Sequence, residues 1–321
     1  MPTRREFLRL SAAAAATAGA LGPLAGAARA QDAEERRKAL ERPLPKRPLG
    51  KTGLEVTALG LGCFYLGSVR DGAAAEAVMR RAFDLGVNWF DTAPSYNAGV
   101  SEERLGRALR GVRDRVLLAT KSTERSGRAA VRELEASLGR LGTDRVDLFQ
   151  FHALRTDEDA ERIFGEGGAH EAILGAKKAG KVRHIGFTGH FDPALMARVC
   201  AERPVETVLM PLNALDPHSR SFEEGALPAA REKGLGVIAM KVFASGRLVD
   251  DPALSPSPEE CVRYSLSLPI ATAIVGCSTM EELERDLACA KTSAPLSERE
   301  RKAILERTRP FSERRIEWYK R

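Results

Sequence analysis

The stretch RVLLATKSTERSGRAAVRELEASLGRLGTDRVDLFQFH, residues 115–152, contains one complete strand–helix–strand unit. Its two ends, Arg115–Thr120 and Val146–His152, are short and almost continuously apolar, as expected for strands that are buried on both faces. The middle, Ala129–Leu141, repeats apolar residues at helical spacing, and Gly142 follows where a helix commonly ends. The unit therefore predicts two parallel strands that are joined by a helix.

The same alternation of strand and helix continues through the chain from residue 48 onward. The predicted strands are Ala58–Gly62, Asn88–Asp91, Arg115–Thr120, Val146–His152, Val182–Thr188, Thr207–Met210, Gly236–Lys241 and Thr272–Val275. The predicted helices are Ala73–Leu85, Ser101–Leu109, Ala129–Leu141, Ala169–Ala179, Pro193–Glu202, Gly225–Lys233, Pro258–Ser267 and Met280–Lys291. Strands that are each followed by a helix favour an α/β fold, a (β/α)8 TIM barrel. A doubly wound open sheet is the alternative, but no Gly-x-Gly-x-x-Gly motif follows the first strand.

Two additions complete the predicted barrel domain, which spans residues 48–321. Residues 48–57 are expected to form an N-terminal β-hairpin at the bottom of the barrel, and Ser297–Arg307 an extra C-terminal helix. The preceding residues 31–47 are rich in charge and contain two prolines, which predicts a solvated linker.

The first 30 residues are predicted to form a targeting signal that is not part of the folded domain. Arg4 and Arg5 are followed by a weakly hydrophobic run, Leu10–Ala27, and by the small-residue exit Ala28-Arg29-Ala30. This order resembles a twin-arginine (Tat) signal peptide, which implies recognition by the Tat export machinery, cleavage after Ala30 and a periplasmic location. An uncleaved membrane anchor is the alternative, but the run is short and mostly Ala and Gly. No stable membrane insertion is expected after cleavage.

Composition excludes several other classes of protein. The chain has 321 residues and 50 Lys and Arg against 44 Asp and Glu, a net charge of +6. This excess is spread thinly and partly belongs to the first 30 residues, so it does not predict a nucleic-acid partner. The 5 cysteines are odd in number and form no Cys-x-x-Cys pair, so neither a disulfide scaffold nor a metal site is expected.

Polar residues stand where three neighbouring predicted strands end, which in such a barrel is the catalytic face. Asp91 ends the second strand and Tyr96 follows it, Lys121 follows the third, and His152 ends the fourth. A neighbouring ammonium stabilises a phenolate, a carboxylate holds the ammonium, and an imidazole can orient a carbonyl group. The set suits protonation of a carbonyl oxygen while a hydride reaches the carbon.

The motifs Asp91-Thr-Ala-x-x-Tyr96, Ala-Thr-Lys121 and Phe-Gln-Phe-His152 resemble the catalytic tetrad of the aldo-keto reductase family. The resemblance covers about residues 46–306. It implies an oxidoreductase that moves a hydride between a nicotinamide cofactor, NAD(P)H, and a carbonyl or alcohol substrate. It further implies that Tyr96 is the general acid, Lys121 tunes its pKa, Asp91 anchors the lysine, and His152 orients the substrate.

The resemblance also assigns a cofactor site, in which this sequence departs from the family. The Ser-Asn pair and the Gln that usually hold the carboxamide are replaced by Thr188-Gly189 and Leu209, and Asn213 is a candidate substitute. Met240 stands where an aromatic residue commonly stacks on the nicotinamide, and Lys241 could reach the pyrophosphate. The remaining cofactor residues implied by the resemblance are Gly62, Cys63, Gly276, Ser278, Glu282 and Asp286.

The cofactor preference follows from the segment after the last strand. Ser278 and Glu282 stand where many relatives place an arginine for the 2′-phosphate, which favours NADH over NADPH because a carboxylate repels phosphate. Arg285 keeps NADP(H) open as an alternative. Some relatives with similar departures carry an iron–sulfur domain, but no cysteine cluster of that kind is present here.

The substrate pocket and two competing functions remain open at this point. Phe64, Tyr65 and Trp89 are candidates for aromatic pocket walls. An exported enzyme would need a tightly bound cofactor that is recycled by the substrate or by a redox partner. One competing function is a cofactor-binding redox sensor or regulatory protein with little turnover. The other is a barrel enzyme that forms a Schiff base through Lys121.

Overall fold

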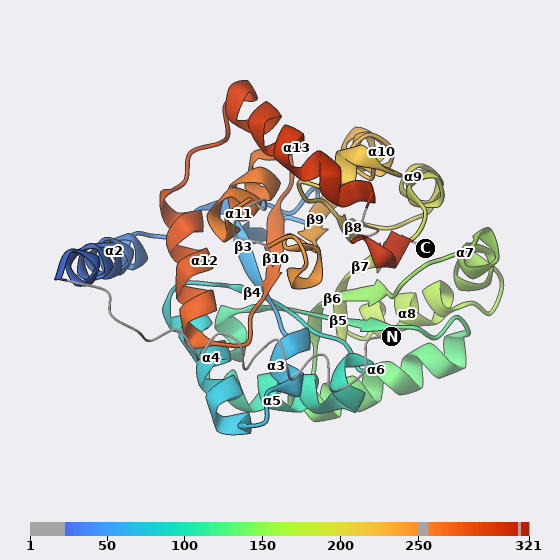
Figure 1. The fold of residues 1–321 in the computed structure, drawn as a ribbon. Helices are drawn as coiled ribbons and strands as arrows, with labels where there is room; N and C mark the ends of the chain where they lie inside the picture. Colours follow the sequence, from blue (N-terminus) through green and yellow to red (C-terminus); the bar gives the residue numbers. More distant parts are fainter. Residues whose placement is uncertain (1–22, 250–255, 314–315, 321) are drawn as a thin grey trace. The chain divides into compact units, whose positions relative to one another are not determined.

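A computed structural model describes residues 23–249, 256–313 and 316–320 (Figure 1). The chain divides into two units, Met1–Lys38 and Ala39–Arg321. Helix α2 (Pro23–Glu41) makes up the described part of the first unit and continues to Glu41. Arg4, Arg5 and most of the predicted signal peptide lie outside the described residues. None of the described helices is both long and apolar enough to cross a membrane.

The second unit is a closed barrel of eight parallel strands, which confirms the predicted fold class (Figure 1). The strands are β3 (Leu59–Gly62), β4 (Trp89–Asp91), β5 (Leu117–Ser122), β6 (Val146–Phe151), β7 (Val182–Thr188), β8 (Thr207–Pro211), β9 (Gly236–Met240) and β10 (Thr272–Gly276). They follow the order of the sequence, and β10 closes the barrel by pairing with β3. All eight lie within two residues of the predicted bounds.

Helices surround this barrel on the outside (Figure 1). They are α3 (Phe64–Ser68), α4 (Gly72–Asp84), α5 (Val100–Ala108), α6 (Gly127–Leu141), α7 (Asp157–Phe164), α8 (Ala169–Lys178), α9 (Pro193–Glu202), α10 (Ala226–Lys233), α11 (Pro258–Ser267) and α12 (Met280–Thr292). The sequence reasoning missed α3 and α7. Helix α3 is only one turn long, and α7 begins at a Thr156 side chain that accepts from the Asp159 amide, a signal that was present but unused.

The hairpin closes the bottom of the barrel, as expected. Strands β1 (Lys46–Pro48) and β2 (Glu55–Thr57) pair antiparallel. Leu49, Leu54 and Val56 are buried in one cluster with inward-facing residues of six barrel strands, among them Trp89 and Leu148. Trp89 is therefore part of the lower barrel core and does not line a substrate pocket, so that expectation was wrong.

The segment 31–47 differs from the expected linker. It is helical as far as Glu41, and its last two residues belong to β1. The charged residues that suggested a linker support the helix instead, because Arg37 pairs with Glu34 at helical spacing, 2.9 Å apart. Leu44, between the helix and the hairpin, is buried in the main core.

The chain ends over the barrel. Helix α13 (Glu298–Glu313) is longer than predicted, and the short helix η6 (Trp318–Lys320) follows it. In Figure 1 this last segment lies beside the ends of β7 and β8. Lys320, only 4% exposed, donates to Asp216 Oδ1 and the Ser219 carbonyl, each at 2.8 Å. This buried ion pair fixes the tail against the loop after β8.

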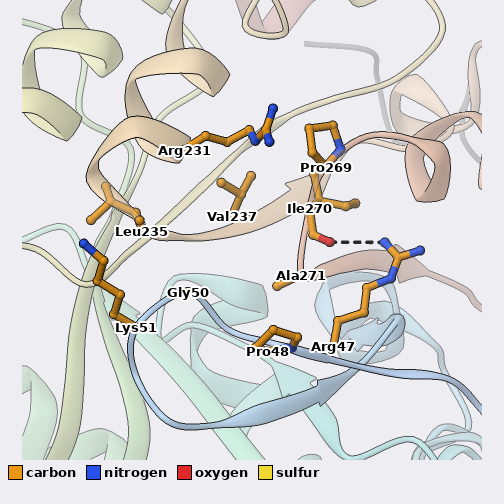
Figure 2. A pocket seen from close by; sticks show the side chains of 11 residues that line it. Arg47, Pro48, Gly50, Lys51, Arg231, Leu235, Val237, Pro269, Ile270 and Ala271 are labelled. Carbon is orange, nitrogen blue, oxygen red and sulfur yellow. Dashed lines mark hydrogen bonds between the residues drawn. The ribbon is translucent and has the colours of Figure 1, made fainter.

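A groove of about 420 Å³ opens at the opposite, hairpin end of the barrel (Figure 2). It lies between the hairpin and the starts of β9 and β10, and Arg47 spans it by donating to the Ile270 carbonyl. The catalytic end of the barrel is elsewhere, so this groove is not the active site.

Candidate active site

The carboxyl ends of β4, β5 and β6 bring the predicted tetrad together. Lys121 Nζ donates to Asp91 Oδ1 at 2.5 Å and to the Thr92 carbonyl at 2.8 Å. Gln150, one strand further on, donates from Nε2 to Asp91 Oδ2 at 3.2 Å. The lysine and the aspartate are each 1% exposed, so the ion pair is fully enclosed.

Tyr96 and His152 complete the set above this ion pair. The ammonium of Lys121 lies 4.8 Å from the centroid of the Tyr96 ring. The rings of Tyr96 and His152 are 5.9 Å apart, and Phe64 packs edge-on against Tyr96 at 5.1 Å. The four predicted catalytic residues therefore converge on one place, and Phe64 borders it as expected.

An unusual backbone turn positions Tyr96. The next two residues, Asn97 and Ala98, have φ angles of 55° and 54°, which are costly for residues other than glycine. The Asn97 side chain holds this turn by donating to the Phe64 carbonyl at 2.8 Å and by bonding to the Ser68 hydroxyl at 2.6 Å. Asn97 is thus a positioning residue that the sequence reasoning missed.

Burial and charge set the protonation states of the buried pair. Burial raises the pKa of Asp91, although Lys121 and Gln150 oppose this rise. Burial alone would lower the pKa of Lys121, but Asp91 and Tyr96 outweigh it and the net pKa is raised. The lysine is therefore a charged ammonium at neutral pH, which argues against a Schiff base because that chemistry needs the free amine.

Tyr96 keeps its proton in this environment. Burial raises its pKa, and the ammonium of Lys121 lowers it by a smaller amount, so the pKa stays above its ordinary value. The sequence reasoning had considered only the lowering effect of Lys121. A protonated phenol beside an ammonium is prepared to give its proton to an acceptor that develops negative charge.

His152 is neutral, and Arg125 holds its backbone in place. Burial first, and then Lys121 and other nearby cations, hold its pKa well below the ordinary value. Arg125 donates to the backbone carbonyls of His152 and Ala153 at 2.9 and 3.2 Å, and to Asp159 at 3.0 Å. Burial alone would raise the pKa of Asp159, but the hydrogen bonds that it accepts from Arg125 and from the backbone amides of Arg155 and Thr156 keep this pKa below its usual value. Arg125 was not singled out from the sequence.

The residues predicted to bind the nicotinamide carboxamide make contacts with other parts of the protein. The Thr188 hydroxyl accepts from the Ala153 amide at 2.9 Å, so it supports the loop that carries His152. A side chain at Gly189 would require the Met196 side chain to move, and it would lie close to the Leu154 carbonyl. Leu209 faces the apolar lower cluster. Asn213 donates to the Lys241 carbonyl and the Tyr319 hydroxyl, both at 3.0 Å, so it is not a free substitute.

Met240 and Lys241 stand at the mouth of the barrel, where β9 ends. Met240 packs on the lower cluster and is partly exposed. Lys241 has a φ of 61°, and its Nζ lies 3.4 Å from Ser245 Oγ and 5.5 and 5.7 Å from the ring centroids of Tyr319 and Trp318. Its pKa is lowered by burial. The C-terminal tail thus supplies aromatic rings that the sequence reasoning did not place here.

The other predicted cofactor residues divide into two groups. Gly62 and Gly276 pair at the ends of β3 and β10 and are partly exposed, and the Tyr65 ring packs on Gly276. Cys63 is fully buried in the main core, so its thiol does not face the barrel mouth.

Ser278 directly precedes the N-cap of α12, and Glu282 and Asp286 lie in the first two turns of this helix. The Glu282 carboxylate accepts from the amides of Ser278 and Thr279 at 2.7 and 3.1 Å, and so caps its own helix. Asp286 is 1% exposed, pairs with Arg285 through Oδ1 at 2.8 Å, and has no partner for Oδ2. Burial raises its pKa to about 7. No cluster of three or more potential metal ligands occurs in the described part of the chain.

Fold and site together give a (β/α)8 barrel with a tyrosine, a lysine, an aspartate and a histidine gathered at the carboxyl ends of its strands. A model of the aldo/keto reductase family matches residues 58–262. The chain belongs to the aldo/keto reductase family, and it is an oxidoreductase.

Known relatives agree with this assignment. An uncharacterised oxidoreductase of Bacillus subtilis, YqkF, is 26% identical over 309 residues, which cover 82% of this chain and 96% of the relative. L-galactose dehydrogenase of Arabidopsis thaliana is 30% identical over 280 residues, covering 75% of this chain and 86% of that protein. The holo form of an aldo-keto reductase from Bacillus halodurans superposes with a TM-score of 0.70 at 26% identity, covering 82% and 96% of the two chains.

Proposed function

We propose that this chain reduces a carbonyl compound to an alcohol with a nicotinamide cofactor, and that Tyr96 is the general acid. The observation that carries the proposal is the enclosed ion pair below Tyr96, in which Lys121 donates to Asp91 at 2.5 Å and lies 4.8 Å from the phenol ring. The overall reaction converts the carbonyl compound, the reduced cofactor and one proton into the alcohol and the oxidised cofactor. The loss of turnover in Tyr96→Phe tests this proposal and is developed in the Discussion.

Four residues of the chain have separate roles in the proposed reduction of the carbonyl group. When bound, the reduced nicotinamide supplies a hydride to the carbonyl carbon. Tyr96 donates its phenolic proton to the carbonyl oxygen as negative charge develops there, and Lys121 stabilises the resulting phenolate. Neutral His152 donates a hydrogen bond to the same oxygen and orients it. Asp91 keeps the ammonium of Lys121 in place.

The residues at the barrel mouth fit a nicotinamide dinucleotide. Asp286 Oδ2 is buried without a partner at the position that the resemblance gives to adenine recognition, so a ligand can complete it. Lys241 Nζ makes a long contact of 3.4 Å with Ser245 Oγ and lies near the rings of Trp318 and Tyr319, and it can bind a pyrophosphate. Met240, which is partly exposed, offers an apolar surface for the nicotinamide ring. Glu282 can accept from ribose hydroxyls.

The preference for NADH is expected to depend on Glu282. Its carboxylate occupies the amides at the beginning of α12, and it would repel a 2′-phosphate there. Replacing Glu282 by Arg frees those amides and adds a cation, so we expect the ratio of NADPH to NADH affinity to rise roughly tenfold or more. Equilibrium titration with both cofactors measures this ratio. Glu282→Gln, which removes only the charge, is the matched control and should give a smaller shift. An unchanged ratio in Glu282→Arg would refute the assignment.

We also propose that the chain is exported to the periplasm by the twin-arginine route and cleaved after Ala30. Arg4 and Arg5 carry this proposal together with the apolar run that follows them. No free pool of dinucleotide is expected outside the cytoplasm. The cofactor would therefore cross in the folded enzyme and be recycled there by a second substrate or a redox partner.

Export is tested by replacing Arg4 and Arg5 with lysine. We expect the wild-type chain to reach the periplasm without its first 30 residues, and the variant to stay in the cytoplasm at full length. Cell fractionation with mass spectrometry of both fractions gives the answer. Arg36 and Arg37, replaced by lysine in the same way, form the matched control because they lie beyond the cleavage site. Equal export of both variants would remove the twin-arginine assignment.

A further inference from the structure

His190 is a second, partly buried imidazole near His152, and the proposed mechanism does not use it. It follows β7, and its ring lies 6.3 Å from that of Tyr319. Its Nδ1 is inaccessible to solvent and has no hydrogen-bond partner in the described residues. Burial, and then Lys241 and Arg155, lower its pKa to about 4. A buried and unsatisfied polar group of this kind calls for a ligand or a water molecule as its partner.

Two arginines pack on the ring of the next residue, Phe191. The guanidinium groups of Arg155 and Arg220 lie 5.2 and 5.1 Å from the centroid of the Phe191 ring. Arg155 comes from the loop after β6, Phe191 follows His190 after β7, and Arg220 comes from the loop after β8. We call His190, Phe191, Arg155 and Arg220 the cationic rim. Three loops therefore converge to present positive charge at one side of the barrel mouth.

Nearby carboxylates do not neutralise this charge. Asp159 pairs with Arg125, Asp192 caps α9, and Asp216 and Glu317 pair with Lys320. In residues 23–249, 256–313 and 316–320, neither Arg155 nor Arg220 forms an ion pair. Arg220 donates one N–H to the Lys320 carbonyl at 2.6 Å. The other N–H groups of the two arginines are available to an anion.

The position of the rim separates it from the phosphate end of the cofactor site. The rim lies over the ends of β6, β7 and β8, beside the catalytic His152. The residues that fit the adenosine half, Glu282 and Asp286, lie beyond β10, which in the closed barrel is separated from β8 by β9. Lys241 also faces His190 but is assigned to the pyrophosphate. An anion at the rim would therefore belong to the substrate.

We propose that the cationic rim binds an anionic group of the carbonyl substrate, a carboxylate or a phosphate ester, while the carbonyl oxygen lies between Tyr96 and His152. This inference rests on the proposed reductase function and adds the substrate class. Arg155 presents planar paired N–H groups that match either anion, and neutral His190 donates one hydrogen bond. The Phe191 ring keeps the guanidinium groups in place. The charge of the substrate thus fixes its orientation before hydride transfer.

The first test compares aldehydes of nearly the same shape. We expect kcat/KM for para-formylbenzoate to exceed that for its neutral methyl ester by roughly ten- to hundredfold, the value of one or two charge-assisted hydrogen bonds. The phosphate ester of para-hydroxybenzaldehyde is the third substrate and distinguishes a phosphate from a carboxylate preference. Equal values for the ester and both anions would overturn the proposal.

Variants of the rim residues test whether the preference for anionic substrates depends on the cationic rim. Arg155→Met and His190→Phe are each expected to reduce the ratio of anionic to neutral kcat/KM by about tenfold or more. Arg231→Met is the matched control, because Arg231 lies on the groove at the opposite end of the barrel (Figure 2) and should leave the ratio unchanged. A preference for anions that survives in both rim variants would also overturn the proposal.

Binding without turnover separates this inference from the function on which it rests. Titration of the wild-type holoenzyme with para-(hydroxymethyl)benzoate, followed by NMR of the His190 ring, should raise the pKa of His190, because a bound anion stabilises the imidazolium. A raised pKa of His190 without any aldehyde reduction would support the anion site and contradict the reductase function. Reduction of the neutral ester without any shift of this pKa would support the reductase function and contradict the anion site.

Discussion

Replacing Tyr96 by Phe is expected to lower the turnover of a carbonyl substrate by about 10²–10⁴-fold, the usual contribution of a general acid. The ring still packs on Phe64 and His152, so only the proton donor is lost. The affinity for the cofactor should change little. Because the pKa of Tyr96 lies above its ordinary value, the wild-type rate of reduction should stay level through neutral pH and fall only in alkali.

The matched control for this variant is Tyr264→Phe. Tyr264 is also buried, but its hydroxyl donates to Glu223 at 2.8 Å in the contact between α11 and the loop before α10. It should lose some stability and no turnover. Single-turnover kinetics with cofactor bound separate the chemical step from binding. If Tyr96→Phe turned over at the wild-type rate, another group would have to be the acid.

Replacing Lys121 by Met is expected to remove activity and also to lower the free energy of unfolding by about 3–5 kcal/mol, because it leaves a buried carboxylate without its counter-charge. Burial already raises the pKa of Asp91. In the variant this carboxyl binds more protons folded than unfolded, so its destabilising effect grows as the pH rises and shrinks as the pH falls. Denaturation in urea at several pH values measures this dependence.

The double variant Asp91→Asn/Lys121→Met distinguishes charge from packing. With both charges removed, stability should return to within about 1–2 kcal/mol of the wild type, whereas activity should stay lost. Gln150 can still contact the residue at position 91. A double variant as unstable as Lys121→Met would mean that the shape of the lysine, rather than its charge, matters most.

The sequence predicted the barrel well because its local signals agree with the fold. The expected bounds of β7, α9 and α11 are those of the structure. Helices α9 and α11 both begin with a capping side chain, Asp192 or Ser257, followed directly by proline. The short helices α3 and η6 have no such capping signals. They depend on contacts with distant segments, which the local sequence does not show.

The proton-transfer residues were recoverable because they form local motifs at strand ends. Their supporting residues were not, because each acts across a long sequence distance. Arg125 reaches from the loop after β5 to the backbone after β6, and Tyr319 contacts Asn213 from the far end of the chain. Asn213 looked available for a cofactor only because its C-terminal partner could not be seen in the sequence.

The direction of two other side chains in the barrel also could not be predicted from the sequence. Trp89 and Asp91 both face inward, but Trp89 lies one layer lower, where the hairpin covers it. Cys63 follows the inward-facing Gly62 and therefore points outward into the layer of helices. Proximity to a catalytic residue in the sequence did not settle which layer or face each residue occupies.

The most direct test of the central claim is transfer of deuterium to an aldehyde from NADH that is labelled at the hydride position, with a chain of residues 31–321 as the enzyme. We expect the alcohol product to carry one deuterium on its carbinol carbon, and Tyr96→Phe to form this product far more slowly. An enzyme that binds the cofactor but yields no deuterated alcohol from neutral or anionic aldehydes would contradict the reductase function. That result would favour the cofactor-binding sensor instead.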